Sequence, residues 1–250
     1  MTKPNYTDIT VILDRSGSMA SVRKDMEGGF DSFIEKQRAV PGECTVSLVQ
    51  FDDQYEVVYS GKKLSDVPKM TLEPRGYTAL TDAIARTIDE TGRRLAAMRE
   101  EDRPSQVVLM IITDGHENAS TEFKRQDVID RITHQRGKYN WTISYLGTNQ
   151  DAMETAKTFG IHDNAITYQN TSAGAYAMFN TISDDMSRSR ESLERGVYSP
   201  MFLTDKLYSV KLQEETDRRA GQEEQKEVKT GFFTTLKNLV SGDSDTGASV

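Results

Sequence analysis

The sequence predicts an α/β fold in which a mostly parallel sheet is covered by helices on both faces. Over the first 200 residues, apolar runs rich in β-branched residues alternate with amphipathic helical stretches, as in βαβ units. The run from Val107 to Ile112 has no polar interruption, which is typical of a central strand buried on both faces. Only Asp52-Asp53-Gln54 separates Cys44–Phe51 from Tyr55–Tyr59, which indicates a hairpin and therefore one antiparallel edge strand.

The other elements follow from the spacing of apolar residues. Strands are expected, in chain order, at 9–13, 44–51, 55–59, 107–112, 141–146 and 165–168. The first helical stripe runs from Val22 to Ile34, and Pro41-Gly42 ends it. Later stripes cover 80–98, 128–132, 152–159 and 175–186. Gly160 suits the position that follows a helix end, and the last stripe runs toward Gly196.

The sequence changes character near residue 201. Residues 212–231 are dominated by Glu, Gln, Lys and Arg, a composition that suits a solvated helix or a disordered linker. Apolar side chains then return on one helical face at 231–240. We therefore expect a domain at 1–200 and a charged C-terminal extension at 201–250. Its short amphipathic segment is expected to dock on a partner or on the chain itself, with self-association as one outcome.

Composition and charge exclude several classes of protein. The 250 residues are 36% hydrophobic and 28% charged, enough for one large domain or two small ones. The single cysteine, Cys44, excludes an intrachain disulfide and a four-cysteine zinc site. Thirty-one basic against 39 acidic residues give a net charge of −8, which argues against nucleic-acid binding.

Targeting signals are also missing from the pattern. No stretch approaches 18 uninterrupted apolar residues, so no membrane span is expected. No long apolar run precedes the first strand, so no secretory signal is expected either. A cytoplasmic protein is the resulting expectation.

Polar side chains follow the first strand and the central strand of the predicted sheet. Asp14-Arg15-Ser16-Gly17-Ser18 comes after the first strand, Thr113-Asp114-Gly115 after the central one, and Gly76-Tyr77-Thr78 opens a helix. Ligands of open α/β sheets lie beyond the carboxyl ends of the strands. We therefore expect two carboxylates and three hydroxyls at one edge of the sheet, namely Asp14, Ser16, Ser18, Thr78 and Asp114.

Oxygen ligands of this kind suit a hard divalent cation such as Mg²⁺ or Mn²⁺. Because three of the five ligands are neutral hydroxyls, an octahedral ion would keep an open, electrophilic position. The best occupant of that position is a carboxylate from outside the chain. A helix expected just beyond Ser18 would favour the same anion through its N-terminal dipole. The pattern predicts a receptor for an acidic side chain.

The combination Asp14-x-Ser16-x-Ser18, Thr78 and Asp114 resembles the metal-ion-dependent adhesion site of the von Willebrand factor A domain family. The resemblance covers about residues 5–196. It implies a Rossmann-like, doubly wound, six-stranded sheet with helices on both faces. It also implies that the hydroxyls of Ser16, Ser18 and, with ligand bound, Thr78 touch the metal, while Asp14 and Asp114 act mostly through water or hydrogen bonds.

The family resemblance implies a non-enzymatic, Mg²⁺-dependent interaction module, completed by a Glu or Asp of a partner protein. Because the sequence shows neither a signal peptide nor a disulfide frame, it is most similar to stand-alone intracellular members from bacteria and their viruses. The neighbours Arg15 and Tyr77 are candidates for contacts with the partner. For His116, Glu117 and Asn118 a solvated loop is the simpler interpretation, and Asp82 suits a helix cap.

Two other functions would use the same residues. In a self-assembling structural subunit, an acid of one copy would enter the metal site of the next; donors in the extension are Glu214, Glu215, Glu223, Glu224, Asp243 and Asp245. A metal-dependent phosphohydrolase is less consistent with the sequence. Ser16 stands where phosphotransferring α/β enzymes carry a second aspartate, and no glycine-rich phosphate loop ends in Lys-Ser or Lys-Thr.

Overall fold

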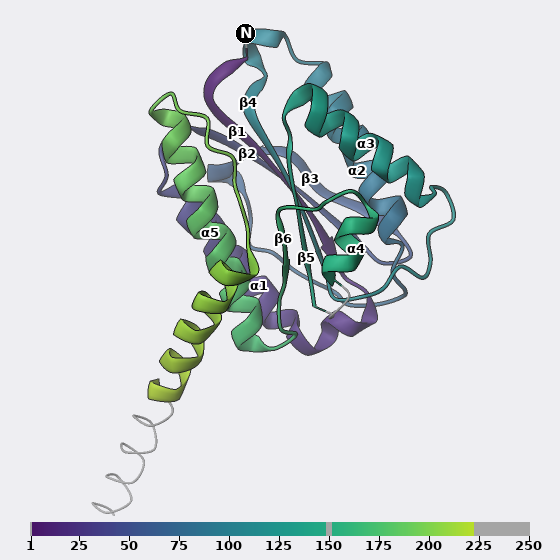
Figure 1. Cartoon of the computed structure of the whole chain (residues 1–250), viewed down its shortest axis with the longest axis vertical. Coiled ribbons are helices and arrows are strands. Elements are labelled where there is room, and N and C mark those ends of the chain that lie inside the picture. Colours follow the sequence, from purple (N-terminus) through teal and green to yellow (C-terminus); the bar gives the residue numbers. More distant parts are fainter. Residues whose placement is uncertain (1, 149–151, 223–250) are drawn as a thin grey trace, which may run out of the picture. The chain divides into compact units, whose positions relative to one another are not determined.

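A computed structural model describes residues 2–148 and 152–222, and six strands form one sheet in the order β3-β2-β1-β4-β5-β6 (Figure 1). The strands are β1 (Lys3–Asp14), β2 (Glu43–Phe51), β3 (Tyr55–Lys63), β4 (Pro104–Thr113), β5 (Thr142–Gly147) and β6 (Ala165–Thr167). All neighbouring strands pair in parallel except β2 and β3, which form an antiparallel hairpin at one edge. The predicted fold class is confirmed.

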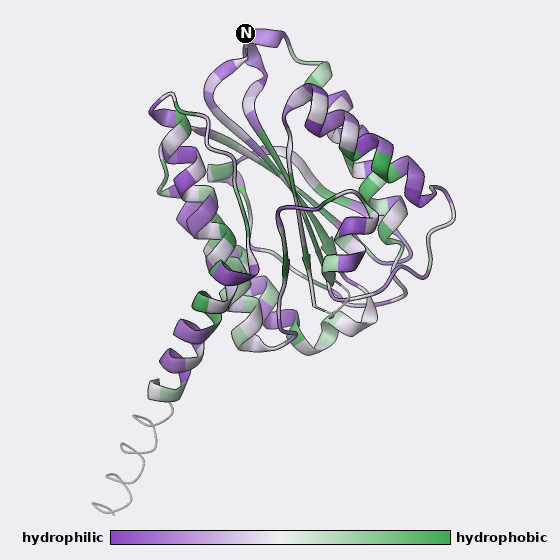
Figure 2. Ribbon diagram, in the orientation of Figure 1, coloured by the Kyte–Doolittle hydropathy of each residue, from purple (hydrophilic) through white to green (hydrophobic). Residues whose placement is uncertain are grey.

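Helices cover both faces of the sheet (Figure 1). The described helices of the domain are α1 (Arg23–Arg38), α2 (Leu80–Ala96), α3 (Arg125–Tyr139), α4 (Ala152–Thr158) and α5 (Ser172–Glu194). α1 and α5 share one apolar core with one face, and α2, α3 and α4 share another core with the opposite face. Figure 2 shows the strands as mostly hydrophobic, whereas the helices carry hydrophilic and hydrophobic residues in alternation.

The expected elements occur with shifted ends. β1 begins at Lys3 rather than Ile9. Its first residue, Lys3, pairs with Pro104 of β4, and a shift in register separates this pair from the regular pairing that starts at Thr7. Residues 17–22 form a short 3-10 turn, η1 (Gly17–Val22), so α1 itself starts one turn later than the sequence suggested. Gly160 and Gly196 both have positive φ angles, as expected of residues that follow helix ends.

The chain divides into two compact units, residues 1–212 and 213–250. In the first unit, Met201, Leu203 and Tyr208 belong to the apolar core that contains α1 and α5. Residues 205–222 are helical. The amphipathic segment predicted at 231–240 lies outside the described residues. Among the residues that are described, no helix combines the length and apolar character needed to cross a membrane.

The order of the strands reverses between β1 and β4. The chain passes from β1 to β2 on one side and later returns to β4 on the other. Such a reversal leaves a crevice above the carboxyl ends of the two central strands. Asp14 ends β1 and Asp114 directly follows β4, so the fold places both predicted carboxylates at this crevice.

Candidate functional site

Asp14 is fully buried at the end of β1, and hydrogen bonds hold both oxygens of its carboxylate. Oδ1 accepts from the backbone N–H of Ser16 at 2.7 Å, and Oδ2 accepts from the hydroxyl of Thr113 at 2.6 Å. The first bond is a local turn that Asp favours after a strand. The second links the ends of the adjacent strands β1 and β4, so the carboxylate has a fixed orientation.

Asp114 is joined to the first loop by a chain of hydroxyls. The Ser18 hydroxyl donates to Oδ1 of Asp114 at 2.6 Å, and the Ser16 Oγ lies 3.1 Å from the Ser18 Oγ. The side-chain amide of Asn170 donates to Oδ2 of Asp114 at 3.2 Å. Both serine hydroxyls therefore lie beside the carboxylates, as the sequence predicted.

Thr78 reaches the same space from the loop before α2. A Cβ atom placed on Gly115 would lie 2.8 Å from the Thr78 Oγ1 and 3.4 Å from the Asp14 Oδ2. The hydroxyl and the carboxylate thus face each other across Gly115. Asn118 fixes the loop, because its side chain accepts from the Thr78 N–H at 2.9 Å and its own N–H donates to the Thr78 carbonyl at 3.0 Å. The structure brings all five predicted residues together.

The two carboxylates are electrostatically unusual. Burial raises the pKa of Asp14 to about 6, against the bonds from Thr113 and Ser16, and the charge of Asp114 adds to this increase. Burial also raises the pKa of Asp114, although bonds from Ser18 and Asn170 oppose the shift. No lysine or arginine of the described chain forms an ion pair with Asp14. The charged group that contributes to its shift is a second carboxylate, that of Asp114.

Other buried carboxylates of the domain have clear partners. Asp8 pairs with Arg94 at 2.8 Å, and Asp52 with Arg15 at 3.0 Å and Arg75 at 2.8 Å. Burial would raise the pKa of Asp52, but the hydrogen bonds and charges of its arginines lower it overall. Asp14 therefore differs from these groups, because a buried negative charge without a cation is costly.

The donor set fits a hard cation and not a soft one. Within residues 2–148 and 152–222, no cluster of three or more His, Cys, Asp or Glu side chains is arranged to hold a metal. The candidate site has two carboxylates and draws its remaining oxygens from hydroxyl groups. Such all-oxygen surroundings suit Mg²⁺ or Mn²⁺.

Several neighbouring residues have roles different from those expected. Arg15 is buried in its ion pair with Asp52 and is not exposed to a partner. Thr78 does not cap α2 with its side chain; the carboxylate of Glu117 accepts from the Thr81 N–H at 2.7 Å instead. Asp82, for which a cap was expected, does not cap the start of α2; it accepts from the backbone N–H groups of residues 121–123 and so holds the loop before α3.

Asn170 was missed by the sequence analysis. It lies between β6 and α5, 56 residues beyond Asp114 in the chain. The rule that used the ends of β1 and β4 could have found it, because Asn170 also follows the carboxyl end of a parallel strand. The shortness of β6 obscured this signal.

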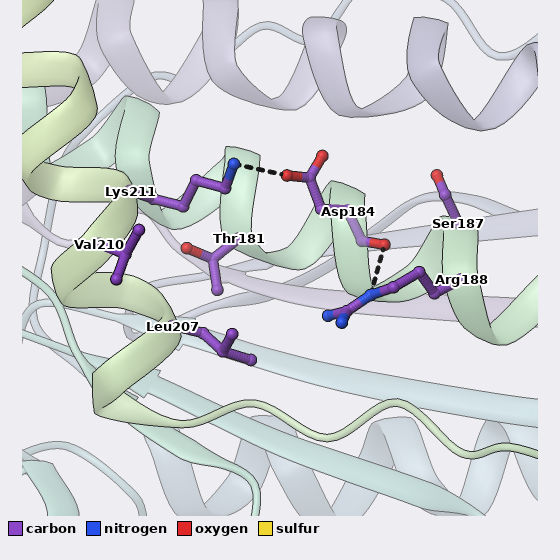
Figure 3. Close-up of a pocket in the computed structure, with 7 residues that line it drawn as sticks. All are labelled: Thr181, Asp184, Ser187, Arg188, Leu207, Val210 and Lys211. Carbon is purple, nitrogen blue, oxygen red and sulfur yellow. Dashed lines mark hydrogen bonds and ion pairs between the residues drawn. The ribbon is translucent and has the colours of Figure 1, made fainter.

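A separate hollow lies between α5 and the helical residues that begin at 205 (Figure 3). Its lining includes Leu207 and Val210, and Lys211 forms an ion pair of 2.9 Å with Asp184. The Arg188 Nε donates to the Asp184 carbonyl at 3.4 Å. None of the five predicted site residues lines this hollow, Lys211 pairs with Asp184, and Arg188 pairs with Asp185. It is not part of the candidate site.

Comparison with known proteins supports the fold. A family model described as the von Willebrand factor type A domain matches residues 8–184. A structure of proximal thread matrix protein 1 from the mussel byssus, with a zinc-occupied MIDAS motif, is 17% identical with a TM-score of 0.54; the match covers 74% of this chain and 46% of that chain. Another structure of that protein has 17% identity and a TM-score of 0.52, with 73% and 45% covered.

A von Willebrand factor type A structure from Catenulispora acidiphila is 16% identical with a TM-score of 0.48, covering 74% of this chain and 42% of that chain. The chain thus spans less than half the length of these solved structures. No curated protein sequence matches it. At such identities the likeness concerns the fold alone.

Proposed function

Because the chain belongs to the von Willebrand factor type A domain family, we propose that it is a non-enzymatic module that captures an acidic side chain of a partner protein through a divalent metal ion. The observation that carries this proposal is the pair Asp14 and Asp114. Both carboxylates are buried, both have raised pKa values, and three hydroxyls surround them. A divalent cation would compensate this buried charge.

The division of roles follows from the contacts. Both oxygens of Asp14 already accept hydrogen bonds, and so do both oxygens of Asp114. In agreement with what the family resemblance implies, these carboxylates would act mainly through water or through the groups they bind, while the hydroxyls of Ser16, Ser18 and Thr78 would contact the ion. Bound Mg²⁺ or Mn²⁺ would supply an electrophilic position that a partner's Glu or Asp can fill.

The chemistry of the neighbouring residues supports binding rather than catalysis. A phosphohydrolase needs a nucleophile or a general acid and base close to its metal. The residue two places after Asp14 is Ser16, whose hydroxyl lies against that of Ser18. Glu117 is occupied in capping α2.

Titration calorimetry with MgCl₂ and MnCl₂ tests the metal, and affinity capture from the native cytoplasm tests the partner. We expect one divalent ion to bind and the captured proteins to be released by EDTA. The Asp14→Ala variant should neither bind the ion nor capture these proteins. Absence of metal binding by the wild-type protein, or unchanged capture by the variant, would contradict the proposal. Light scattering with and without EDTA separates capture of another protein from self-assembly.

Removal of the amide of Asn170 should weaken Mg²⁺ binding. Asn170→Leu keeps the shape of the side chain but loses the hydrogen bond that orients Asp114. Loss of a bond that orients a ligand typically costs 10- to 100-fold in metal affinity, so about a tenfold higher Kd is expected by calorimetry. Asn180→Leu is the matched control, since Asn180 contacts Lys36 and not the site. Equal Kd values for the two variants would contradict this role.

A further inference from the structure

Tyr77 is the most exposed large apolar side chain of the described residues, with 70% of its surface accessible. It directly precedes Thr78, which lies in the candidate metal site. Within the part of the chain that the structure describes, no hydrogen bond, ion pair or ring contact engages the Tyr77 side chain. The exposed ring thus makes no polar or ring contact in the described domain, and its backbone adjoins Thr78 of the candidate site.

The backbone around Tyr77 is held on both sides. Before it, the Arg75 N–H donates to the Arg15 carbonyl at 2.8 Å; after it, the Ala79 N–H donates to the Asp52 carbonyl at 2.8 Å. Gly76 has φ +65°, and a Cβ atom at this position would collide with the Asp53 carboxylate. The loop thus requires glycine at 76, and its backbone is fixed on both sides of the exposed Tyr77.

Binding hot spots often place an aromatic side chain beside a charged anchor, and a tyrosine has only two side-chain torsions, so little conformational entropy is lost when it is covered. We propose that Tyr77 is a second contact for the partner. The partner segment would carry an apolar or aromatic side chain within two residues of the Asp or Glu that reaches the metal. This inference rests on the proposed function and adds the chemistry of the partner sequence.

The experiment is selection from a displayed library of random peptides, in Mg²⁺ and with elution by EDTA. The wild-type protein should enrich peptides that contain Asp or Glu with an apolar or aromatic neighbour. Tyr77→Ser should still require the acid but lose the preference for the neighbour, and the best wild-type peptide should bind it about tenfold more weakly. Tyr139→Ser is the matched control, because Tyr139 is also exposed but lies at the end of α3.

Calorimetry separates the two proposals. Tyr77→Ser should bind Mg²⁺ with the wild-type Kd, because the phenol ring is not among the expected ligands. An unchanged neighbour preference in Tyr77→Ser, or selection of Lys or Arg as the neighbour by the wild type, would overturn the inference and leave metal-dependent capture intact. If the wild-type protein selects no EDTA-sensitive peptide containing an acid, the proposed function fails and the inference with it.

Discussion

Asp14→Asn should make the metal-free protein more stable and abolish its response to Mg²⁺. The ionised Asp14 is buried beside Asp114, and burial raises its pKa to about 6. In EDTA at pH 7.5 the neutral amide of the variant avoids the cost of a buried charge. It has only one acceptor oxygen, however, for the two donors that bind Asp14, the Ser16 N–H and the Thr113 hydroxyl. We expect a gain of about 1 to 2 kcal/mol in the free energy of unfolding, smaller than the roughly 3 kcal/mol that the pKa shift represents.

The same group predicts the pH dependence of the wild-type protein in EDTA. A carboxyl whose pKa is raised on folding binds more protons in the folded state, so it favours folding at low pH. Its contribution should be lost as the pH rises from about 4 to about 6. Saturating Mg²⁺ should restore stability above that range, by about 2.7 kcal/mol at a hundredfold excess over Kd. Urea unfolding at several pH values, with and without Mg²⁺, measures both effects.

Asp52→Asn is the matched control for this substitution. Asp52 is as deeply buried as Asp14, but it pairs with Arg15 and Arg75, and its pKa is lowered. The amide should therefore destabilise the protein, by about 2 kcal/mol, while the response to Mg²⁺ stays. A metal-free Asp14→Asn protein that is less stable than the wild type, or that is still stabilised by Mg²⁺, would contradict the role assigned to Asp14.

The fold could be predicted because its signals are local. An uninterrupted apolar run placed the central strand β4, and Asp52-Asp53-Gln54 placed the antiparallel hairpin. Four of the five site residues followed from one topological rule, since the ends of β1 and β4 were already located, and Thr78 was added because it opens a helix. These inferences need only periodicity and turn chemistry, and both are written in neighbouring residues.

The features of the site that could not be predicted from the sequence depend on contacts between distant segments. Arg15 looked like a residue of the rim, but its side chain turns inward to Asp52 on the neighbouring strand. Asn170 reaches Asp114 only because β6 and β4 end at the same edge. In both cases a polar side chain that could equally well be solvated instead binds a partner that is far away in the sequence. The spacing of residues along the chain does not show which distant group such a side chain binds.

Arg190 is another polar side chain whose partners lie far away in the sequence, and it is the largest fully buried side chain of the described residues. It lies on α5 with 1% of its surface exposed, and no carboxylate pairs with it in the described chain. Its guanidinium instead donates to the carbonyl oxygens of Gln37, Val40, Pro41 and Gly42 and to the Gln37 side chain, at 2.7 to 3.4 Å. These groups lie in the last turn of α1 and just after it, where the helix dipole is negative. Arg190 thus closes α1 from the neighbouring helix.

Arg190→Met should cost about 3 to 4 kcal/mol in the free energy of unfolding. Methionine fills much of the apolar volume, but it leaves the buried carbonyl of Gln37 and the part-buried carbonyls of residues 40–42 without this donor. For a domain of this size that loss corresponds to a fall of roughly 6 to 16 °C in Tm. Arg188→Met is the control on the same helix: Arg188 is 61% exposed and pairs with Asp185, so its loss should cost less than about 1 kcal/mol. Similar Tm values for the two variants would mean that the carbonyl groups at the end of α1 do not depend on Arg190.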